Sequence, residues 1–471
     1  MLVLVAVVTA CNERPKATDD PWAQVPIPAA HTDHASLIQG PFADAFAVTR
    51  RCLECHPDAA REMQETSHWT WISDQVEVAG REEPLPIGKR NMINNFCISV
   101  EGNWPRCTSC HAGYGWQDDS FDFTSEEAVD CLVCHDQSGG YVKAPAGAGM
   151  PAPGVDLVQV AKSVGRPTRT NCGACHFSGG GGDAVKHGDM DATMKFPSPR
   201  IDVHMGKHGF ECVDCHRTEN HQIGGKLPGM SSAIDLCIWC IDCHSEQPHA
   251  DERINTHLPE VSCQACHIPY YAIEAETKMS WDWSTAGLEN APDERRYSKN
   301  KGSFEFARQV VPVYQWCNGT VDRYLPGQTF DPDKELHLSC PRGDVTAADA
   351  QIWPFKVHKG RQVYDVQYKY LLKPKLYGPG GYWEDFDWDL ALRLGAESSG
   401  LPYSGEYAFA DTAMCWPITH MVQPKERALQ CTDCHGHADR LDWQALGYSG
   451  DPADRGTREQ LDLLSNSGAT N

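Results

Sequence analysis

The residues with the clearest chemistry are cysteines and histidines in one repeated pattern, Cys-x-x-Cys-His. Sixteen of the 22 cysteines belong to eight copies of it. Two cysteines three positions apart lie on one side of a helical turn and can form two thioethers to one porphyrin, while the adjacent histidine binds its iron. A redox dithiol or a zinc ribbon does not need a histidine directly after each pair. The pattern therefore predicts eight covalently attached haem c groups.

The eight copies define the predicted attachment residues and one iron ligand each. They are Cys52/Cys55/His56, Cys107/Cys110/His111, Cys131/Cys134/His135, Cys172/Cys175/His176, Cys212/Cys215/His216, Cys240/Cys243/His244, Cys263/Cys266/His267 and Cys431/Cys434/His435. Two pairings compete at the sixth copy, because Cys237 lies three positions before Cys240. Only the pair Cys240/Cys243 is followed directly by a histidine, so we assign the haem to it.

Thirteen further histidines supply candidates for the second axial position of each iron. A haem that only transfers electrons favours two strong ligands, so seven such haems need seven more histidines. The predicted distal ligands, most of them close to an attachment site, are His34, His68, His204, His221, His249, His257 and His420. Which histidine serves which haem stays open, and each has an ordinary surface or core histidine as its alternative. The weaker candidates are His208, His337, His358 and His437.

The eight haems also limit the fold class and its organisation. So many porphyrins supply much of the buried apolar surface, at roughly 25 cal/mol per Å². We therefore expect a mainly α multihaem cytochrome c fold organised around packed haems, with extensive irregular and loop structure and little β. The 40 glycines and 31 prolines agree with a loop-rich chain.

The attachment sites divide the chain into regions. Residues 34–267 hold seven sites, residues 268–430 form a haem-free covering region, and residues 431–471 hold the eighth site and a polar tail. Ten aromatic residues between positions 353 and 388 are interpreted as lids that cover haem edges and make oligomer contacts. A separate catalytic domain is the alternative, but the stretch holds no nucleotide loop, HExxH or GxSxG motif.

Composition and the first residues predict the compartment. The formal charge of −23 argues against nucleic-acid binding, and no stretch approaches the roughly 20 apolar residues of a spanning helix. Residues 1–11, MLVLVAVVTAC, resemble a signal remnant that ends in a lipoprotein cleavage site, with a linker over 12–33. The basic region that normally precedes such a segment is missing, and a chance apolar start is the alternative. Because c-type haem attachment occurs outside the bacterial cytoplasm, we expect a periplasmic or cell-surface protein, with lipidated Cys11 as an anchor.

The cysteines outside the haem motifs and Cys11 number five: Cys97, Cys237, Cys317, Cys340 and Cys415. Cys317 and Cys340 lie in one haem-free stretch and could close a short loop as a disulfide, and a pair of Cys237 with Cys415 is conceivable. The pairing stays open. Cys97 is the candidate free thiol, with a buried inert cysteine as its alternative.

A glycine run follows the fourth attachment site, from Gly179 to Gly182, and leads into Asp183 and Lys186. Four glycines let the backbone lie flat against a porphyrin. One helical turn would bring Asp183 and Lys186 together. A flexible loop with a surface ion pair is the alternative interpretation.

These motifs together resemble the octahaem tetrathionate reductase family. The resemblance rests on the order of the eight sites, the Asn94-x-x-Cys97 motif, the run after the fourth site, the segments 202–205 and 281–283, and the long haem-free stretch. It covers most of residues 34–450. Cys317 and Cys340 depart from the family pattern, which leaves the fine structure around them open.

The resemblance implies an active site at the second haem. Lys186 would be the distal ligand opposite His111, and Asn94, Cys97 and Asp183 would line the same pocket. A lysine ligand must be neutral, which costs ~4–5 kcal/mol at pH 7 from a reference pKa of ~10.4. Lys89, Arg90 and His187 would supply positive charge for an anionic substrate, and Cys97 could hold a sulfur atom as a thiolate or persulfide.

The resulting prediction is a periplasmic oxidoreductase that reduces tetrathionate, with nitrite and hydroxylamine as further candidates. The expected partners are a quinol-linked or soluble redox donor and a small inorganic anion, and the chain is compatible with a homo-oligomer. One alternative is an electron conduit without a substrate. Another is a hydroxylamine-oxidising octahaem enzyme, which needs a tyrosine cross-linked to a porphyrin. The chain has no CxxCK site of the kind found in octahaem nitrite reductases.

Overall fold

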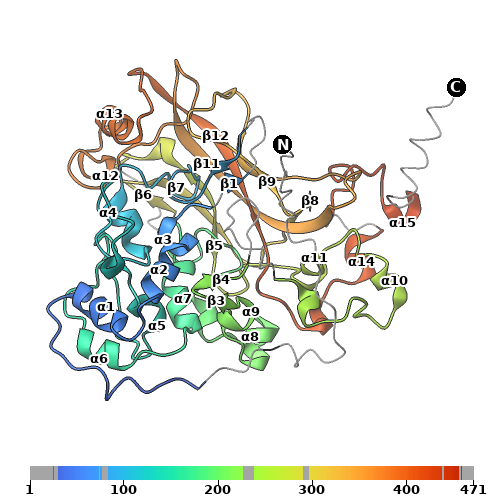
Figure 1. Ribbon diagram of the computed structural model, residues 1–471. Helices are drawn as coiled ribbons and strands as arrows, with labels where there is room; N and C mark the ends of the chain where they lie inside the picture. The colour runs from blue at the N-terminus through green and yellow to red at the C-terminus, as the bar shows by residue number, and fades with distance from the viewer. Residues whose placement is uncertain are drawn as a thin grey trace, which may run out of the picture.

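The computed structural model describes residues 25, 30–73, 75–76, 83–225, 238–289, 296–436, 440–455 and 458. The predicted signal remnant with Cys11, and also Cys237 and His437, lie outside the described residues. Figure 1 shows two parts: short helices and loops that carry the haem motifs, and a twisted sheet that lies against them.

Short helices joined by irregular segments make up the first part. They are α1 (Ala45–Leu53), α2 (Ala59–Gln64), α3 (Ser67–Thr70), α4 (Trp104–Cys107), η2 (Thr108–Cys110), η3 (Glu126–Ala128), α5 (Leu132–His135), α6 (Leu157–Lys162), α7 (Arg169–His176), η4 (Ala192–Lys195), α8 (Val203–His208), α9 (Cys212–Cys215), η5 (Cys240–Asp242), α10 (Glu252–Asn255), α11 (Cys263–His267), α14 (Cys431–Cys434) and α15 (Pro452–Arg455). Seven of the eight Cys-x-x-Cys-His copies coincide with a short helix or a 3-10 turn, as their spacing predicts. The expected short helices and long irregular segments are thus present.

The first attachment motif departs from this rule at Cys55. Helix α1 ends at Leu53, so Cys52 lies within the helix while Cys55 and His56 lie beyond its end. The backbone amides of Cys55 and His56 both donate to the carbonyl of Cys52, at 3.1 and 3.0 Å. The bond from His56 to Cys52 has the i→i−4 spacing of an α-helix, so Cys52 and Cys55 share one helical turn that extends past Leu53.

Polar caps begin several of these helices and so determine where the histidines lie. The Asp202 carboxylate accepts hydrogen bonds from the backbone amides of His204 and Met205, at 2.9 and 3.0 Å, and starts α8. The Ser262 hydroxyl accepts from the amide of Ala265 and starts α11. Because these helices are only one or two turns long, a cap is a large share of their local stability.

The second part is an eight-stranded sheet, so the expectation of little β structure was wrong for this region. The strand order is β6-β7-β5-β11-β12-β10-β9, and β8 pairs with β11. Its strands are β5 (Thr277–Asp282), β6 (Tyr297–Ser298), β7 (Gly302–Ala307), β8 (Val313–Cys317), β9 (Val321–Arg323), β10 (Leu336–Pro341), β11 (Gln351–Asp365) and β12 (Tyr407–Pro417). Two small hairpin sheets pair β1 (Gln75–Val76) with β2 (Leu85–Pro86) and β3 (Thr218–Glu219) with β4 (Gln222–Ile223).

The long strands β11 and β12 form the centre of the sheet. They pair antiparallel from Phe355 opposite Pro417 to Asp365 opposite Tyr407. β5 adds to β11 in parallel, and β10 adds to β12 in parallel. Helices α12 (Tyr382–Asp385) and α13 (Trp388–Ser399) and the short turns η6 (Trp283–Thr285) and η7 (Lys425–Arg427) complete this part.

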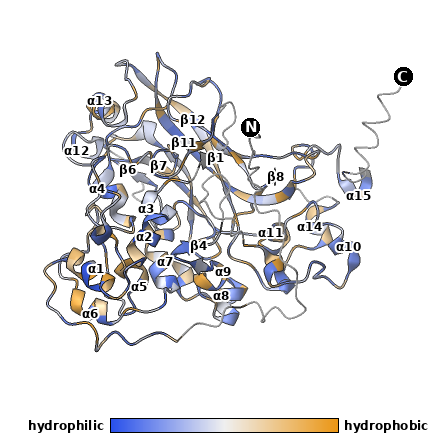
Figure 2. Ribbon diagram, in the orientation of Figure 1, coloured by the Kyte–Doolittle hydropathy of each residue, from blue (hydrophilic) through white to orange (hydrophobic). Residues whose placement is uncertain are grey.

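Aromatic side chains of residues 268–430 build a core of their own. Trp281 stacks on Trp283 with ring centres 4.5 Å apart, and Tyr382 stacks on Trp388 at 4.0 Å. These residues belong to one buried cluster. A stretch without porphyrins must bury its own apolar surface, which explains why many of the aromatics expected as lids lie inside. Figure 2 shows hydrophobic and hydrophilic residues interspersed along the elements. None of the described helices has the length and apolar character needed to cross a bilayer.

Polar contacts attach two predicted site segments to the sheet. The Asn95 amide donates to the carbonyl of His358 on β11 at 2.6 Å, and the Gln362 amide donates to the carbonyl of Asn94 at 2.9 Å. The Thr277 hydroxyl of β5 donates to the carbonyl of Ala184 at 2.6 Å. The sheet is therefore the support on which residues 94–97 and 184–186 are positioned.

Asn103, just before α4, allows a test of this attachment. Its buried side chain donates to the carbonyl of Pro374 at 3.1 Å and accepts from the amide of Leu376 at 2.6 Å. We expect Asn103→Ala to lower the free energy of unfolding by about 2–4 kcal/mol, because buried backbone groups lose their partners. Denaturant unfolding followed by circular dichroism measures this. Asn300→Ala, at a half-buried loop residue that only accepts from the Ser298 hydroxyl, is the control and should change little.

Candidate functional site

Six histidines from the attachment motifs each face a second histidine at nearly the same distance. The distances between ring centres are 6.3 Å for His56–His34, 6.0 Å for His176–His68, 6.2 Å for His216–His420, 6.1 Å for His244–His204, 6.1 Å for His267–His249 and 6.1 Å for His435–His257. Two imidazoles on opposite sides of one iron, with metal–nitrogen bonds of about 2 Å, have ring centres about 6.3 Å apart. The residues present therefore fit six haems with two histidine ligands each.

Hydrogen bonds at the other ring nitrogen orient many of these imidazoles. Nδ1 contacts a backbone carbonyl in His34, His135, His216 and His257, the side-chain oxygen of Asn255 in His249, and a carboxylate in His221, His420 and His435. A partner at Nδ1 directs Nε2 toward the metal, as is usual for metal-binding histidines. This hydrogen-bond pattern also fits histidines that bind haem iron.

The attachment cysteines differ in how far the protein covers them. Most are half-buried, but Cys55 is exposed, as are Cys215, Cys240 and Cys431. A cysteine that served only the protein core would be buried, so these four positions do not pack as core residues. Exposure at Cys55 follows from its place in the turn beyond α1, where the described side chains leave the thiol uncovered. An attached porphyrin would shield such a thiol. The assignment of Cys55 as an attachment residue rests on the motif and on the facing pair His56–His34, not on burial.

His221 stays the candidate for the third attachment site, where the described rings show no pair at this spacing. It lies close enough to His135 for its charge to help lower the pKa of that histidine. Its Nδ1 contacts a carboxylate oxygen of Glu62 at 2.8 Å. Six of the seven histidines predicted as distal ligands thus face an attachment histidine, although proximity in sequence does not identify the partner. His68 follows the first site but faces the fourth, and His204 precedes the fifth but faces the sixth.

The second attachment site differs from the others. Its histidine, His111, is fully buried among the rings of Trp69, Trp71 and Trp116, at 4.9, 5.5 and 4.8 Å between centres. Its Nε2 lies 2.7 Å from the carbonyl oxygen of Trp69, and its Nδ1 has no hydrogen-bond partner within the described chain. Among the described histidines, none faces His111 at the spacing of the six pairs. The second axial position of this site is therefore open to a different ligand.

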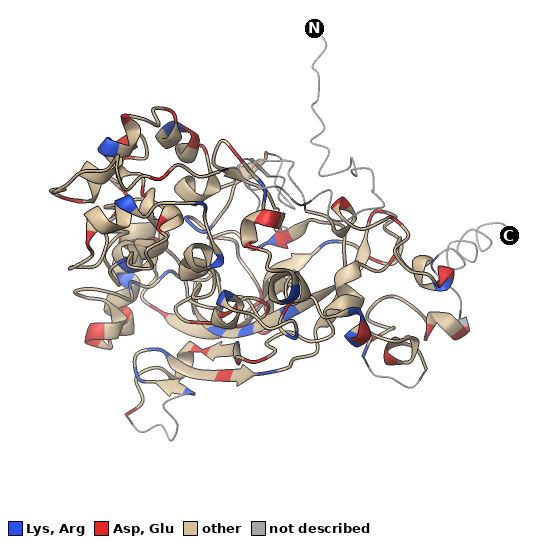
Figure 3. Ribbon diagram, turned by 90° about the horizontal axis from the view of Figure 1, so that it is seen from below, with Lys and Arg blue, Asp and Glu red and all other residues tan. Residues whose placement is uncertain are grey.

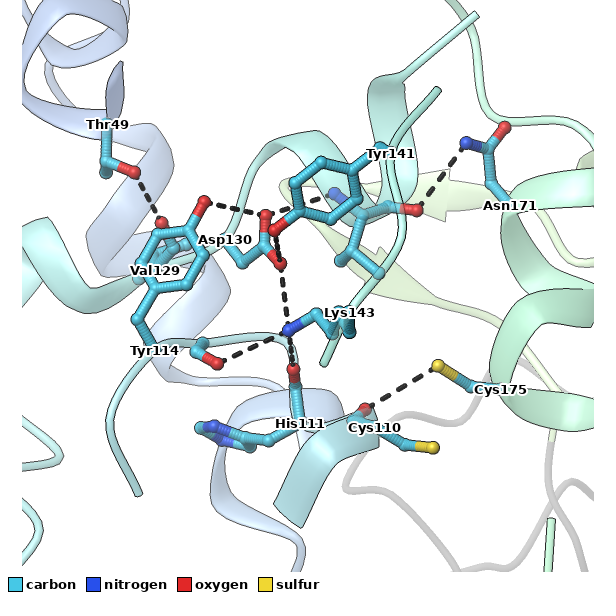
Figure 4. A network of polar contacts seen from close by, with 12 residues as sticks. Thr49, Cys110, His111, Tyr114, Val129, Asp130, Tyr141, Lys143, Asn171 and Cys175 are labelled. Atoms are coloured by element: carbon cyan, nitrogen blue, oxygen red, sulfur yellow. Dashed lines mark hydrogen bonds and ion pairs between the residues drawn. The ribbon is translucent and has the colours of Figure 1, made fainter. Parts of the chain in front are cut away.

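A buried ion pair holds the backbone of this site (Figure 4). The Lys143 ammonium lies 2.8 Å from the Asp130 carboxylate and also donates to the carbonyls of His111 and Gly113. The hydroxyls of Tyr114 and Tyr141 donate to the same carboxylate at 2.9 and 2.7 Å. Asp130 directly precedes Cys131, so this network joins the second and third attachment sites. Sequence reasoning missed it, and the position of Asp130 beside a motif cysteine was the only signal.

Lys186 is half-buried on the sheet side of this region. Its Nζ is 4.6 Å from the ring centre of Trp416 and 5.8 Å from that of Phe96. Burial lowers the pKa of Lys186 to about 7, and the charges of Lys89 and Arg323 lower it further. A large fraction of this amine is thus neutral at pH 7, which metal ligation requires. Lys89 also acts on Cys110 of the second site, so Lys186 and that site share a neighbour.

The glycine run brings Lys186 against the Asn94–Cys97 segment. Gly180 has φ +80°, and a Cβ there would lie 2.6 Å from the Phe96 ring, so only glycine allows this approach. Asn94 shapes the turn: its side-chain oxygen accepts from the Cys97 amide at 2.7 Å, and its NH₂ donates to the Ile98 carbonyl at 3.0 Å. Burial raises the pKa of the Cys97 thiol, against the opposing charges of Lys278 and other cations. A thiolate at Cys97, the form expected for holding sulfur, is therefore disfavoured at neutral pH.

Asp183 does not join this pocket. It is exposed, and its carboxylate accepts from the backbone amide of Ala192 at 2.8 Å. Residues 177–189 form turns rather than a helix, so the spacing that would pair Asp183 with Lys186 does not apply. Asp183 instead closes the loop from outside.

Three cations that sequence reasoning missed surround the pocket. Lys278 on β5 has its Nζ 3.9 Å from the ring centres of both Trp281 and Phe304. Burial lowers its pKa to about 7, and the Lys301 charge adds to this effect. Arg323 is buried, which lowers its pKa to about 10. The chain as a whole is acidic, with acidic positions spread over many helices and loops (Figure 3), so this cluster is a local exception.

Lys356 on β11 is the third missed cation, and it supports the Lys186 segment directly. Its ammonium donates to the carbonyls of Val185 and Lys186 and to the Thr277 hydroxyl, at 2.9, 3.3 and 2.6 Å. Burial lowers its pKa to about 7. The remaining predicted cation positions lie nearby: His187 packs on Trp416 at 5.3 Å, and Arg90 lies 4.3 Å from the ring centre of Phe123.

The attachment sites lie next to one another in a defined order. Thiols from different sites are in hydrogen-bond contact in the pairs Cys52/Cys131, Cys110/Cys175, Cys172/Cys212 and Cys240/Cys263. Charge interactions add the neighbours Cys134/Cys172, Cys215/Cys243 and Cys266/Cys431. In motif numbers, the sites form a row 1-3-4-5-6-7-8, and the second site branches from the fourth.

Comparisons with known proteins agree with this geometry. A family model described as "Cytochrome c bacterial" matches residues 278–438. The crystal structure of octaheme cytochrome c from Shewanella oneidensis is similar to this chain with a TM-score of 0.85 and 48% identity, covering 90% of this chain and 98% of that one. An uncharacterised protein of Archaeoglobus fulgidus is 25% identical over 242 residues, 41% of this chain and 80% of its own length. The prediction of eight c-type haems is confirmed, and the chain has a multihaem electron-transfer role.

The buried Lys356 predicts a pH dependence of stability. Its folded-state pKa of about 7 lies below the ordinary 10.5, so the unfolded chain binds more protons between these values and stability rises with pH. We expect Lys356→Met to reduce this rise by up to about 1.4 kcal/mol per pH unit between pH 7 and 9. Denaturant unfolding at several pH values measures the slope. The control is Lys359→Met, at an exposed lysine on the same strand that pairs with Glu335, and a slope equal in both variants would contradict the prediction.

Proposed function

We propose that this chain, which belongs to the octahaem cytochrome c family, is a periplasmic oxidoreductase that reduces a small sulfur oxyanion at its second haem site. The preferred substrate is tetrathionate, which takes two electrons and is cleaved at its central S–S bond to two thiosulfates. Nitrite and hydroxylamine are further substrates. The donor is a quinol-linked or soluble redox protein, and Cys11 provides a lipid anchor.

The observation that carries this proposal is the amine of Lys186, which is about half neutral at pH 7 and shares the neighbouring charge of Lys89 with the second attachment site, whose His111 faces no described histidine at the spacing of the six pairs. Burial lowers the pKa of this lysine to about 7, and no hydrogen bond or ion pair of its Nζ occurs within the described chain. The bound haems supply one-electron transfer along the row and an iron at the second site. An amine lone pair at Lys186 can bind a metal, and its protonated form can instead attract an anion.

The cations around the pocket support an anionic substrate. Lys278 lies near Lys301 and Lys186 lies near Lys89, and in each case the neighbouring charge helps to lower the pKa. Neighbouring cations repel one another, and an anion bound between them stabilises their charged forms. Their distribution over β5, β9 and the loop at Lys89 lets them contact a dianion from several sides.

Lys356 and Asn94 position the reacting groups. Lys356 holds the backbone carbonyl of Lys186, and Asn94 holds the amide of Cys97. Buried polar contacts of this kind keep side chains in one orientation and limit water in the pocket. Cys97, as a neutral thiol, can donate a weak hydrogen bond or a proton to a departing sulfur atom.

An electron conduit without a substrate is the second candidate. The continuous row of attachment sites from the first to the eighth favours it, because conduction needs only adjacent haems. A hydroxylamine-oxidising enzyme would need a tyrosine bonded to a porphyrin. The conduit would make Lys186 dispensable, whereas the reductase would not.

Lys186→Ala tests the active site. We expect the EPR spectrum to change for one of the eight haems and tetrathionate reduction, driven by a chemical reductant, to fall at least about tenfold, because the iron loses its amine ligand. Lys369→Ala, at an exposed lysine, is the control. Unchanged spectra together with unchanged rates for tetrathionate, nitrite and hydroxylamine would leave the conduit as the function.

Lys278→Met tests whether the cations select an anion. Loss of one buried positive charge should raise the KM for tetrathionate about tenfold, which corresponds to roughly 1.4 kcal/mol. The KM for neutral hydroxylamine should change much less. Steady-state kinetics of both substrates give the comparison, with Lys299→Met, at a half-buried lysine paired with Glu289, as the control. Equal effects on the two substrates would show that the lysine has only a structural role.

A further inference from the structure

Three cysteines outside the haem motifs gather on the sheet: Cys317 of β8, Cys340 of β10 and Cys415 of β12. The disulfide considered from sequence, Cys317 with Cys340, is not the contact that the structure shows. The Cys340 thiol instead makes a hydrogen bond with the thiol of Cys415. The Cys317 sulfur accepts from the Gly319 amide at 3.4 Å and turns toward the Thr320 carbonyl.

The strand register places Cys340 and Cys415 side by side. β10 and β12 run parallel with Ser339 opposite Met414, so Cys340 and Cys415 occupy the next pair of positions. The Ser339 hydroxyl donates to the carbonyl of Cys415 at 3.0 Å and accepts from its amide at 3.1 Å, which holds the two strands at this point. The proximity of the thiols therefore follows from backbone pairing and does not depend on a mobile loop.

A β-bulge brings a histidine to the same place. The register of β10 shifts between His337 and Ser339, so one extra residue lies between them. With this extra residue, His337 and Cys340 fall on the same face of the strand, and their side chains make a hydrogen bond. His337 is exposed at the surface.

Cys340 has the properties of an attacking nucleophile, and Cys415 has those of a resolving thiol. Cys415 is buried, and its pKa is raised by the contact with Cys340 and by burial. Cys340 is half-buried, and the hydrogen bond from Cys415, with help from His337, lowers its pKa to about 6. A thiolate at Cys340 is the attacking form, and the protonated thiol of Cys415 is in hydrogen-bond contact with it.

An open hollow of about 580 Å³ lies beside this pair. Its lining includes Asp322, Arg323, Tyr324, Gln328 and His337. Arg323 provides a positive charge for a small anion, and the His337 ring provides a hydrogen-bond donor. The hollow shares Arg323 with the surroundings of Lys186, but β9, β10 and their loop form it, and none of its lining residues belongs to a haem motif.

We propose that Cys340 and Cys415 form a redox-active dithiol that reacts with small anionic compounds containing an S–S bond, the polythionates. The Cys340 thiolate attacks a bridging sulfur of tetrathionate, the central S–S bond breaks, and one thiosulfate leaves. Cys415 then loses its proton and attacks the Cys340 sulfur, which releases the second thiosulfate and forms the disulfide. The two thiols lose two electrons and two protons, and one tetrathionate becomes two thiosulfates. This chemistry needs neither haem iron nor Lys186, so it goes beyond the proposed function.

The experiment uses the complete protein with all haems in the ferric state, so that the thiols are the only source of electrons. The protein is first reduced with a dithiol, reoxidised at the haems and freed of reagent, and then treated with tetrathionate. Released thiosulfate is measured, the remaining thiols are alkylated, and peptides are mapped by mass spectrometry. We expect a Cys340–Cys415 disulfide, loss of both alkylation sites and about two thiosulfates released per chain at these residues. A dithiol reductant should restore both sites.

Variants separate the steps and the alternatives. Cys415→Ser should stop after one thiosulfate and leave an S-thiosulfate adduct on Cys340, while Cys340→Ser should leave Cys415 alkylatable. Cys317→Ser is the matched control and should behave as the wild type. Lys186→Ala should also behave as the wild type, which distinguishes failure of this proposal from failure of the haem site. Wild-type protein in which Cys340 and Cys415 both remain alkylatable, or in which Cys340 links to Cys317, would overturn the proposal.

Discussion

The constraint on which this structure depends is the demand of each haem iron for two ligands on opposite sides. Covalent attachment supplies one histidine from a local motif, but the second must arrive from elsewhere and stop with its ring centre near 6 Å from the first. Very short helices hold some of these histidines, such as His204 in the helix capped by Asp202, and turns and loops hold the others. The irregular segments between them follow from the same demand, because the chain must pass from one porphyrin to the next. Much of the apolar core that stabilises this half of the molecule is the cofactor itself.

Sequence alone could predict features that depend on neighbouring residues, but not contacts between segments far apart in the chain. The eight attachment sites follow from a spacing of a few residues, and the same reasoning selected six histidines that face an attachment histidine. It could not assign partners, because His68 and His176 lie more than a hundred positions apart and yet face each other. The sheet was missed for a different reason. A haem-free stretch rich in aromatic residues was interpreted as a cover over haem edges, and the alternation of buried and exposed residues that is typical of strands was not considered. Lys278 and Lys356 resemble ordinary strand lysines, and only the packing of β5 and β11 shows that they are buried.

The proposed active site follows from the meeting of the two halves. Residues 94–97 and 179–186 come from the haem-bearing part, yet their backbone groups are held by side chains of β5 and β11. The glycine run allows close approach to Phe96, and burial then changes the chemistry of the lysine that follows it. A flexible surface loop with the same sequence would carry an ordinary charged lysine. The properties of Lys186 therefore belong to the sheet as much as to the loop.

The branch in the row of attachment sites has a consequence for the timing of the reaction. The fourth site touches the second, third and fifth sites, so in the proposed reductase electrons would reach the second site from two arms rather than one. Splitting an S–S bond with a single electron yields a sulfur radical, which a second electron must quench before it diffuses away. A branch point with reduced haems on both arms would shorten that interval. Removal of the outermost sites on one arm would leave the other arm able to deliver both electrons.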